Sequence, residues 1–262
     1  QFEACLGAAA PTCTDANNMP VGTGPFKVTG FTVNDTVSMA ANENYRDPAK
    51  PAFATAVIKG GGDAEGSARA VMETGEFDYA WNTQIPPETQ AAMTAQTRLI
   101  KVQGAAGKGQ FVVAFGTLVE RLEMNTTDPD PALPEGERAT AKHPHPILSD
   151  IKVRTALSKA IDRSILVEVG YGEGGKPTCN VIPAPEAWAS DNTGCIAQDM
   201  EGAKALLDEA GWTDTDGDGI RDKDGKKLHI LYQSTVNPIR QDFQALIKDW
   251  WTELGVEVEP AV

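Results

Sequence analysis

The sequence predicts an α/β fold in which a mixed β-sheet is flanked by helices. Short apolar or alternating segments recur along the chain, and between them lie segments whose apolar residues repeat every three or four positions. The first pattern is typical of strands and the second of amphipathic helices, so their alternation favours layers of sheet and helix. The 262 residues, of which 41% are hydrophobic, are enough to bury a substantial core.

The predicted strands are rich in β-branched or aromatic residues and are bounded by turn residues. They are expected at residues 26–31, 36–41, 55–59, 77–82, 98–102, 110–115, 118–125 and 228–234, with a last strand that begins at Val256. The first two should pair as a hairpin through Asn34 and Asp35, which tolerate a tight turn. Residues 127–146, rich in Pro, Glu and Asp, are expected to form a long loop.

The clearest helix is expected at residues 149–163, where Ser149 or Asp150 can cap the amino end by accepting from a free backbone N–H. Its apolar residues fall on one face at three- and four-residue spacing: Ile151, Val153, Ala156, Leu157, Ala160 and Ile161. Asp162 is expected to cap a second, shorter helix at residues 164–169.

Four further helices are predicted from the same spacing and from their capping residues. They begin at Asp63 or Ser67, at Pro86 or Pro87, at Asp199 and near Pro238, and they end near Gly75, Met93, Gly211 and Leu254. The last of them is expected to bury one stripe of residues: Ile239, Phe243, Leu246, Ile247 and Trp250.

The net charge of −14 disfavours polyanionic partners. A phosphate backbone or an anionic membrane would repel this surface, so we expect neither nucleic-acid binding nor binding to a membrane surface. No apolar run approaches the ~20 residues that span a bilayer, and we expect no membrane insertion. The sequence carries no basic-then-apolar signal segment and is expected to start after any targeting sequence.

The four cysteines form two local pairs, Cys5 with Cys13 and Cys179 with Cys195, in loop-like sequence. Neither pair has Cys-x-x-Cys spacing and no histidine lies nearby, which disfavours zinc. Two disulfides that each close a loop are the preferred interpretation, and they favour an oxidising compartment such as the periplasm. The alternative is four unpaired thiols in a cytosolic protein.

The run from Asp214 to Asp222 carries the clearest metal-ligating pattern. Acidic residues stand at positions one, three and five and glycine at position six, as in the first part of an EF-hand loop. The ligands of a Ca²⁺ ion would be Asp214, Asp216, Asp218, the carbonyl of Ile220, and Asp222. Gly225 stands where the twelfth position needs a bidentate glutamate. The alternative is an Asp/Gly turn whose carboxylates bond their own backbone.

Patterns for catalysis are weak. His143 and His145 could touch a metal together, but no cysteine or third histidine is nearby, so a solvated loop is favoured. The sequence contains no Gly-x-Ser-x-Gly, no His-Glu-x-x-His and no cysteine beside a histidine. We therefore expect no enzyme. A small-molecule hydrolase with a pair of carboxylates is the distant alternative, because such a pair is not visible in a sequence.

Three motifs carry a resemblance to a known family. The first is Asp-x-x-Val-Arg-x-Ala-Leu-Ser-x-Ala-Ile-Asp-Arg at residues 150–163, and the second is Asp-x-x-x-Ala-Lys-x-Leu-Leu-x-Glu-Ala-Gly-Trp at residues 199–212. The third, Pro-Val-Gly-Thr-Gly-Pro-Phe at residues 20–26, is followed by two strands and Asn-x-x-Tyr. Together they resemble the family 5 extracellular solute-binding proteins, the peptide, nickel and oligosaccharide receptors of ABC importers.

This resemblance implies a periplasmic-binding-protein-like lobe of type II. It implies that residues 1–262 form a single lobe, the inserted second lobe of a two-lobe protein whose first lobe is missing. The implied function is capture of a small solute, most of all an oligopeptide, in the periplasm for delivery to an ABC permease. No cofactor would be required, although Ca²⁺ is possible. The alternative of another class is a calcium-stabilised interaction domain outside the cell.

The resemblance also places the ligand between two lobes, against loops at the edge of the sheet. Trp81, Asn82 and Gln84 would lie in one such loop, with core packing as the alternative for Trp81. A second loop would present Thr178, Asn180 and Trp188 and be fixed by a Cys179–Cys195 disulfide. A flat aromatic ring can cover a peptide or sugar, and amides can pair with backbone or hydroxyl groups.

Overall fold

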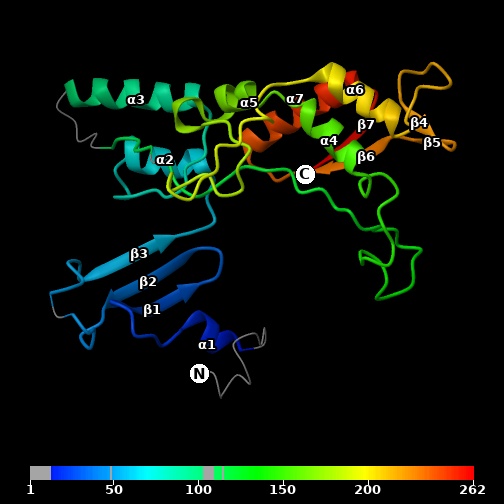
Figure 1. The fold of residues 1–262 in the computed structure, drawn as a ribbon. Helices are drawn as coiled ribbons and strands as arrows, with labels where there is room; N and C mark the ends of the chain where they lie inside the picture. Colours follow the sequence, from blue (N-terminus) through cyan, green and yellow to red (C-terminus); the bar gives the residue numbers. More distant parts are fainter. Residues whose placement is uncertain (1–12, 48, 103–108, 114) are drawn as a thin grey trace. The chain divides into compact units, whose positions relative to one another are not determined.

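The computed structural model describes residues 13–262 except 48, 103–108 and 114, and every structural statement below concerns these residues. The chain separates into two compact units, Gln1–Ser67 and Ala68–Val262. Figure 1 traces the helices and strands of both units along the chain. The single inserted lobe expected for residues 1–262 concerns the architecture of the whole protein and stays a prediction.

The first unit contains a short helix, α1 (Thr14–Asn18), and an antiparallel sheet in the order β1-β2-β3. The strands are β1 (Phe26–Thr32), β2 (Thr36–Ala41) and β3 (Thr55–Lys59), which confirms all three predictions. Asn34 takes a positive φ of 56° in the β1–β2 turn, a conformation that asparagine adopts more readily than most residues. The predicted hairpin is therefore confirmed.

Helix α2 (Ala64–Met72) begins beside Asp63, whose carboxylate accepts from the backbone N–H of Gly66 at 2.6 Å. The second unit continues with α3 (Pro87–Val102), α4 (Ile151–Lys159), α5 (Arg163–Gly170), the 3₁₀ turn η1 (Gly172–Gly174), α6 (Met200–Glu209) and α7 (Pro238–Glu253). Its strands are the antiparallel pair β4 (Asp222–Lys223) and β5 (Lys226–Lys227) and the parallel pair β6 (His229–Gln233) and β7 (Glu257–Ala261).

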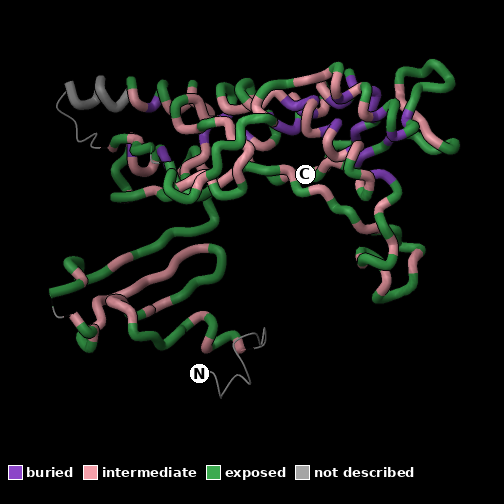
Figure 2. Tube along the Cα trace, viewed as in Figure 1, coloured by how far each residue is buried: buried purple, intermediate pink, exposed green. Residues whose placement is uncertain are grey.

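The core of the second unit lies where α4, α6 and α7 pack with β6 and β7 (Figure 2). Its largest fully buried side chains are Leu157, Leu207, Leu228, Ile239, Leu254, Val153 and Val256. The indole N–H of Trp251 donates to the backbone carbonyl of Leu157 at 3.0 Å and so joins α7 to α4. The side chains of Asp150, Asp162 and Asp199 cap α4, α5 and α6, and all three caps are among those predicted.

One predicted core position is wrong. Ile151 is 63% exposed, because it opens α4 before the helix reaches the core. Trp250 is partly buried and packs against the core, as expected, while the neighbouring Trp251 is buried and its indole reaches the carbonyl of Leu157.

Four predicted strands are also wrong. Residues 98–102 continue α3, because no glycine or proline interrupts the helical pattern after Pro87. Residues 77–82 and 118–125, and the described residues of 110–115, form no ladder with any described strand. An alternating pattern favours an extended chain but supplies no partner, and the pairing partner decides whether a strand forms.

Replacing Leu157 by alanine should destabilise the second unit by about 2–5 kcal/mol, because the site is fully buried and leaves a cavity. Ile151→Ala on the same helix is the matched control and should stay within about 0.5 kcal/mol. Urea unfolding of both variants gives the two values. Equal losses would contradict the placement of α4 in the core.

Candidate functional site

The structure brings Gln84 together with four residues that the sequence did not single out: Glu120, Tyr171, Asn237 and Arg240. We call these five residues the polar cluster. They come from the loop before α3, the extended segment after it, the end of α5 and the start of α7. All five lie in the second unit.

Asn237 links the start of α7 to the loop before α3. Its side-chain oxygen caps α7 by accepting from the backbone N–H of Arg240 at 3.2 Å. Its side-chain NH₂ donates to Oε1 of Gln84 at 2.7 Å. Pro238 follows in the first turn, where its missing N–H costs no helical bond. The cap thus fixes both the helix end and the amide of Gln84.

Arg240 and Glu120 form a two-pronged ion pair. Nε of Arg240 donates to Oε2 of Glu120 at 3.1 Å, and Nη2 donates to Oε1 at 2.9 Å. Burial raises the pKa of Glu120, but the hydrogen bonds and charge of Arg240 outweigh it, so the pKa lies below its ordinary value. The two side chains are 31% and 40% exposed, so the pair remains open to solvent.

Tyr171 reaches the cluster because α5 ends tightly against α7. A Cβ at Gly170 would lie 2.3 Å from the ring of Phe243, so only glycine permits this approach. The ring of Tyr171 then packs edge-on to Phe243 at 5.9 Å, and its hydroxyl accepts from Nε2 of Gln84 at 3.3 Å. Burial, with the charge of Glu120, raises the pKa of this hydroxyl, which therefore stays protonated.

The cluster offers binding groups more than reactive ones. It combines two amides, a neutral phenol, a carboxylate and a guanidinium, and none of the five is a serine, cysteine or histidine. Such groups can hydrogen-bond to peptide or hydroxyl groups of a solute. Arg240 gives the one sequence signal that could have found the site, because a cation in the first turn of a helix opposes the helix dipole and needs a partner.

The other residues predicted for the ligand are mostly on the surface. Trp81 and Trp188 are 76% and 75% exposed, so core packing of Trp81 is wrong. Asn82 is exposed and has a φ of 56°. Thr178 and Asn180 lie together, with the backbone N–H of Asn180 bonded to the hydroxyl of Thr178 at 3.0 Å. Ligand contact by these residues and by Gln84 stays a proposal.

The Cys179–Cys195 disulfide is confirmed, with the two Cα atoms 5.7 Å apart. Cys5 of the other predicted pair lies outside the described residues, and the Cys5–Cys13 disulfide stays a prediction.

The acidic loop forms the Asp/Gly turn that was the alternative to a metal site. Asp214, Asp216 and Asp218 each offer a carboxylate oxygen, and these oxygens lie within 4.8 Å of one another. The carboxylate of Asp214 accepts from two backbone N–H groups, those of Gly217 at 2.8 Å and Gly219 at 3.0 Å. Those of Asp216 and Asp218 accept from one backbone N–H each.

Charge in the same loop is partly compensated without a metal. Lys227 forms an ion pair with Asp218, and hydrogen bonding to Lys227 lowers the pKa of Asp218. Asp222 is bonded instead to the hydroxyl and backbone N–H of Thr215 at 2.7 Å and 3.0 Å. The backbone N–H of Ile220 donates to the carboxylate of Asp218. Among the described residues, the group of side-chain oxygens that could hold a metal comprises those of Asp214, Asp216 and Asp218. A Ca²⁺ ion at these residues stays a prediction.

The histidines of residues 127–146 have structural partners. Nδ1 of His145 accepts from the backbone N–H groups of Ile147 and Leu148 at 3.1 Å and 2.9 Å, and burial lowers its pKa. Nε2 of His143 lies 2.9 Å from Glu137. These bonds favour a loop without a metal, and they disfavour a metal ion bound by both histidines.

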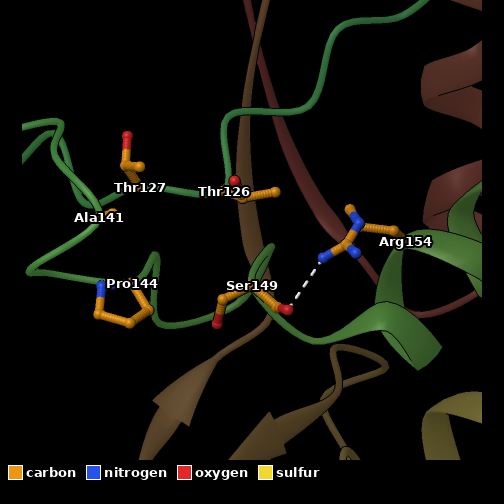
Figure 3. Close-up of a pocket in the computed structure, with 6 residues that line it drawn as sticks. All are labelled: Thr126, Thr127, Ala141, Pro144, Ser149 and Arg154. Atoms are coloured by element: carbon orange, nitrogen blue, oxygen red, sulfur yellow. Dashed lines mark hydrogen bonds between the residues drawn. The ribbon is translucent and has the colours of Figure 1, made fainter.

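A cavity of about 340 Å³ lies between this loop and the start of α4 (Figure 3). Its lining residues are Thr126, Thr127, Ala141, Pro144, Ser149 and Arg154. Nη1 of Arg154 donates to the carbonyls of Leu148 and Ser149 at 2.7 Å and 2.9 Å. The guanidinium thus fastens the segment that enters α4, which is a structural role.

The stabilisation from Glu120 should depend on pH. Its folded pKa lies below the ordinary 4.5, so its contribution is fully present above that value and is lost as the pH falls through the lower folded pKa. Glu120→Gln should therefore cost about 1 kcal/mol at pH 7 and less below pH ~4. Urea midpoints at both pH values measure this. Glu123→Gln, in a 75% exposed ion pair of the same segment, is the control, and a cost for Glu120→Gln that does not change with pH would refute the assignment.

Comparison with known proteins gives both sequence relatives and structural neighbours. The chain is 26% identical over 248 residues to the oligopeptide-binding protein AppA of Bacillus subtilis (strain 168), covering 93% of this chain and 39% of that protein. It is 27% identical over 267 residues to heme-binding protein A of Haemophilus influenzae, covering 98% of this chain and 40% of that protein. The chain thus spans about two fifths of the length of these curated relatives.

Solved structures show the same fold. AppA from Bacillus subtilis in complex with a nonapeptide matches with a TM-score of 0.66 and 22% identity, covering all of this chain and 47% of that one. Lactococcal OppA with an endogenous peptide, in the closed conformation, matches with a TM-score of 0.70 and 19% identity, covering 99% and 46%. These likenesses confirm the predicted α/β fold of the type II periplasmic-binding-protein kind.

The family itself is shown by the sequence. Residues 6–262 match the model for the middle part of the bacterial extracellular solute-binding proteins, family 5. The match covers nearly all of the chain and includes the motifs at residues 20–26, 150–163 and 199–212. The chain belongs to the family 5 extracellular solute-binding proteins.

Proposed function

We propose that this chain is part of the substrate-binding component of an ABC importer and binds a peptide-like solute without catalysing a reaction. The polar cluster carries the proposal, because it holds a partly exposed guanidinium–carboxylate pair beside two amides and a phenol. Family membership supports the binding class. Relatives named as oligopeptide-binding, and the peptides in two solved neighbours, favour a peptide over the Ni(L-His) of a third neighbour.

Exposed apolar side chains precede three members of the cluster closely in sequence: Trp81, Leu118 and Val236. Apolar surface next to hydrogen-bonding groups suits a peptide, whose backbone needs polar partners and whose side chains need apolar contact. The solute would be enclosed when a further lobe, supplied by the remainder of a longer protein, closes on this one. The closed surface would then meet the ABC permease.

The proposed location is the periplasm or the outer face of a membrane. The family is extracellular, and the Cys179–Cys195 disulfide fits an oxidising compartment. In the described part of the chain no helix combines the length and apolarity that a membrane span requires.

Binding of an equimolar pool of tri- to hexapeptides tests this function. We expect binding by the wild type, and weakening of at least about tenfold in Arg240→Gln, since a charged hydrogen bond contributes about 1.5–3 kcal/mol. Lys152→Gln, which removes the same charge from an exposed pair with Glu209, should change affinity less than about twofold. Calorimetry measures all three. Equal affinity of the two variants for the peptides would exclude the polar cluster as the binding site. Tighter binding of Ni²⁺ with histidine than of the peptides would replace the peptide as the proposed solute.

We also propose that residues 214–222 form an Asp/Gly turn that does not bind Ca²⁺. The carboxylates there already accept backbone N–H groups, and Asp218 already has a cation. The thermal midpoint should therefore agree within about 1 °C between a calcium buffer and a chelator, because a ligand that does not bind gives no stabilisation by mass action. A rise of several degrees with Ca²⁺ that Asp216→Asn abolishes would establish the metal site instead.

A further inference from the structure

The loop at residues 178–195 is not held by the hydrophobic core. In the described chain, no hydrophobic residue between Tyr171 and Met200 belongs to the core cluster of the second unit or packs against it. The loop instead exposes three large apolar side chains, Val181, Ile182 and Trp188, at 85%, 54% and 75%. Something other than apolar burial must therefore fix its position.

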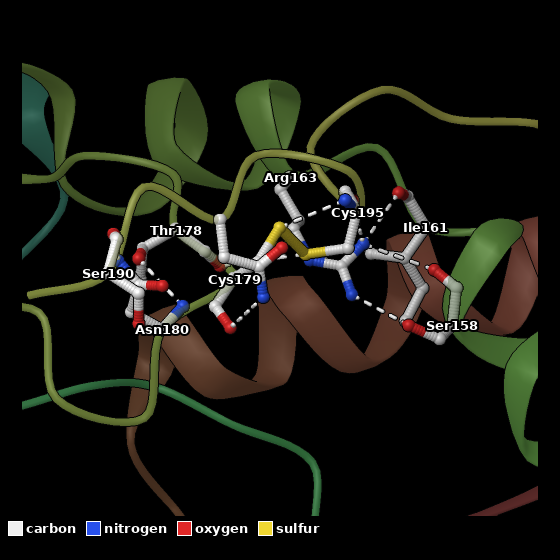
Figure 4. The surroundings of a disulfide bond; sticks show 9 residues. Ser158, Ile161, Arg163, Thr178, Cys179, Asn180, Ser190 and Cys195 are labelled. Carbon is white, nitrogen blue, oxygen red and sulfur yellow. Dashed lines mark hydrogen bonds between the residues drawn. A yellow bond between two sulfur atoms is a disulfide. The ribbon is translucent and has the colours of Figure 1, made fainter.

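Arg163 fixes one end of this loop to the scaffold (Figure 4). Its Nη1 donates to the carbonyl of Cys195 at 2.7 Å and to that of Ser158 at 3.1 Å, and its Nη2 donates to the hydroxyl of Ser158 at 2.9 Å. The carbonyl of Ser158 lies in the last turn of α4, where the backbone N–H of Ile161 also donates to it, at the longer distance of 3.4 Å. One planar guanidinium thus joins the carboxyl end of α4 to Cys195.

Neighbouring bonds hold the chain just after Cys195 on the same helix end. The backbone N–H of Asp199 donates to the carbonyl of Lys159 at 2.9 Å, and the ammonium of Lys159 lies 2.6 Å from the carboxylate of Asp199. Nε2 of Gln198 donates to the carbonyl of Ala160 at 2.8 Å. The Cys195 end of the loop is therefore anchored independently of the disulfide.

The disulfide carries this anchor across to Cys179. The backbone N–H of Cys195 lies 3.0 Å from the sulfur of Cys179, and Asn192 donates to the carbonyl of Cys179 at 3.4 Å. Next to it, the NH₂ group of Asn180 donates to the carbonyl of Ser190, but its Oδ1 is buried and finds no hydrogen-bond partner among the described residues. An unpaired buried oxygen costs free energy, so the hydrogen bonds at Asn180 do not by themselves account for the order of the loop. The covalent link between Cys179 and Cys195 supplies the rest.

We propose that Arg163 is a positioning residue for the loop at residues 178–195, that it acts through the Cys179–Cys195 disulfide, and that reduction of this bond releases the loop and weakens solute binding. The binding part of this statement rests on the proposed function. The loop carries Thr178, Asn180 and Trp188, so its release removes three candidate contacts at once. The core remains folded, because none of its residues lies in the loop.

The redox step needs a dithiol as reductant. A thiolate of the dithiol attacks one cysteine sulfur and breaks the Cys179–Cys195 bond, and the other cysteine leaves as a thiolate and takes a proton. The second thiol of the reductant then displaces the first cysteine from the mixed disulfide. Two electrons pass to the protein, two cysteine thiols form, and the dithiol becomes a disulfide.

Hydrogen exchange read by mass spectrometry tests the anchor without any solute. Exchange of the amides at residues 178–195 should rise at least tenfold in Cys179→Ser/Cys195→Ser, in the wild type reduced with dithiothreitol, and in Arg163→Gln. Exchange in α6 and α7 should stay unchanged. Arg154→Gln is the matched control, because this arginine also bonds two backbone carbonyls, at the other end of α4. It should leave the loop amides as they are.

Binding of the same peptide pool completes the test in the full chain. Weakening of at least tenfold in the double serine variant and in Arg163→Gln, but not in Arg154→Gln, supports the proposal. Unchanged loop exchange in Arg163→Gln overturns the anchor. Faster loop exchange with unchanged peptide affinity overturns the role of the loop in binding and leaves the proposed function standing. Absence of binding by the wild type overturns the proposed function, while the exchange data still decide the anchor.

Discussion

Burial of α4 against α6 and α7 is the contact on which the rest of the second unit depends. Leu157 and Val153 of α4 are fully buried, and so is Leu207 of α6. The bond from the indole of Trp251 to the carbonyl of Leu157 sets how far along α4 the helix α7 lies. With that register fixed, the two ends of α4 become the points at which the surrounding loops are fastened.

Two arginines of α4 and α5 use these ends in the same way. Arg154 donates to backbone carbonyls just before the amino end of α4, and Arg163 donates to a backbone carbonyl at its carboxyl end. A guanidinium suits this task because its planar fork donates several bonds at once and keeps its charge. Both arginines belong to the motif at residues 150–163, so much of that motif specifies a helix whose two ends hold other parts of the chain.

The polar cluster follows from the position of α7. Its first turn presents Asn237 as a cap and Arg240 as a cation at the end of the helix that favours anions. The carboxylate of Glu120 compensates the charge of Arg240 at this helix end, and it comes from a segment that has no strand partner among the described residues. A hydrogen bond between Gln84 and Tyr171 completes the cluster. The site is therefore assembled by side chains on loops and helix ends, which leaves it open to a solute.

The sequence by itself determined most of the helices, the first sheet and the family, but not α1 or the carboxyl part of α3. Caps such as Asp150 and Asp162, and apolar spacing along α4, α6 and α7, are local signals, because each acts within a few residues of the chain. The disulfide between Cys179 and Cys195 was also visible, since its partners are close in sequence.

Only the tertiary structure decided which extended segments pair and which side chains meet. Residues 77–82 and 118–125 have the composition of strands, but pairing depends on a distant partner. Glu120 and Arg240 are 120 positions apart, and no pattern along the chain joins them. Their contact exists because α7 packs against α4 and α5, and long-range packing of this kind is not encoded in any one stretch of sequence.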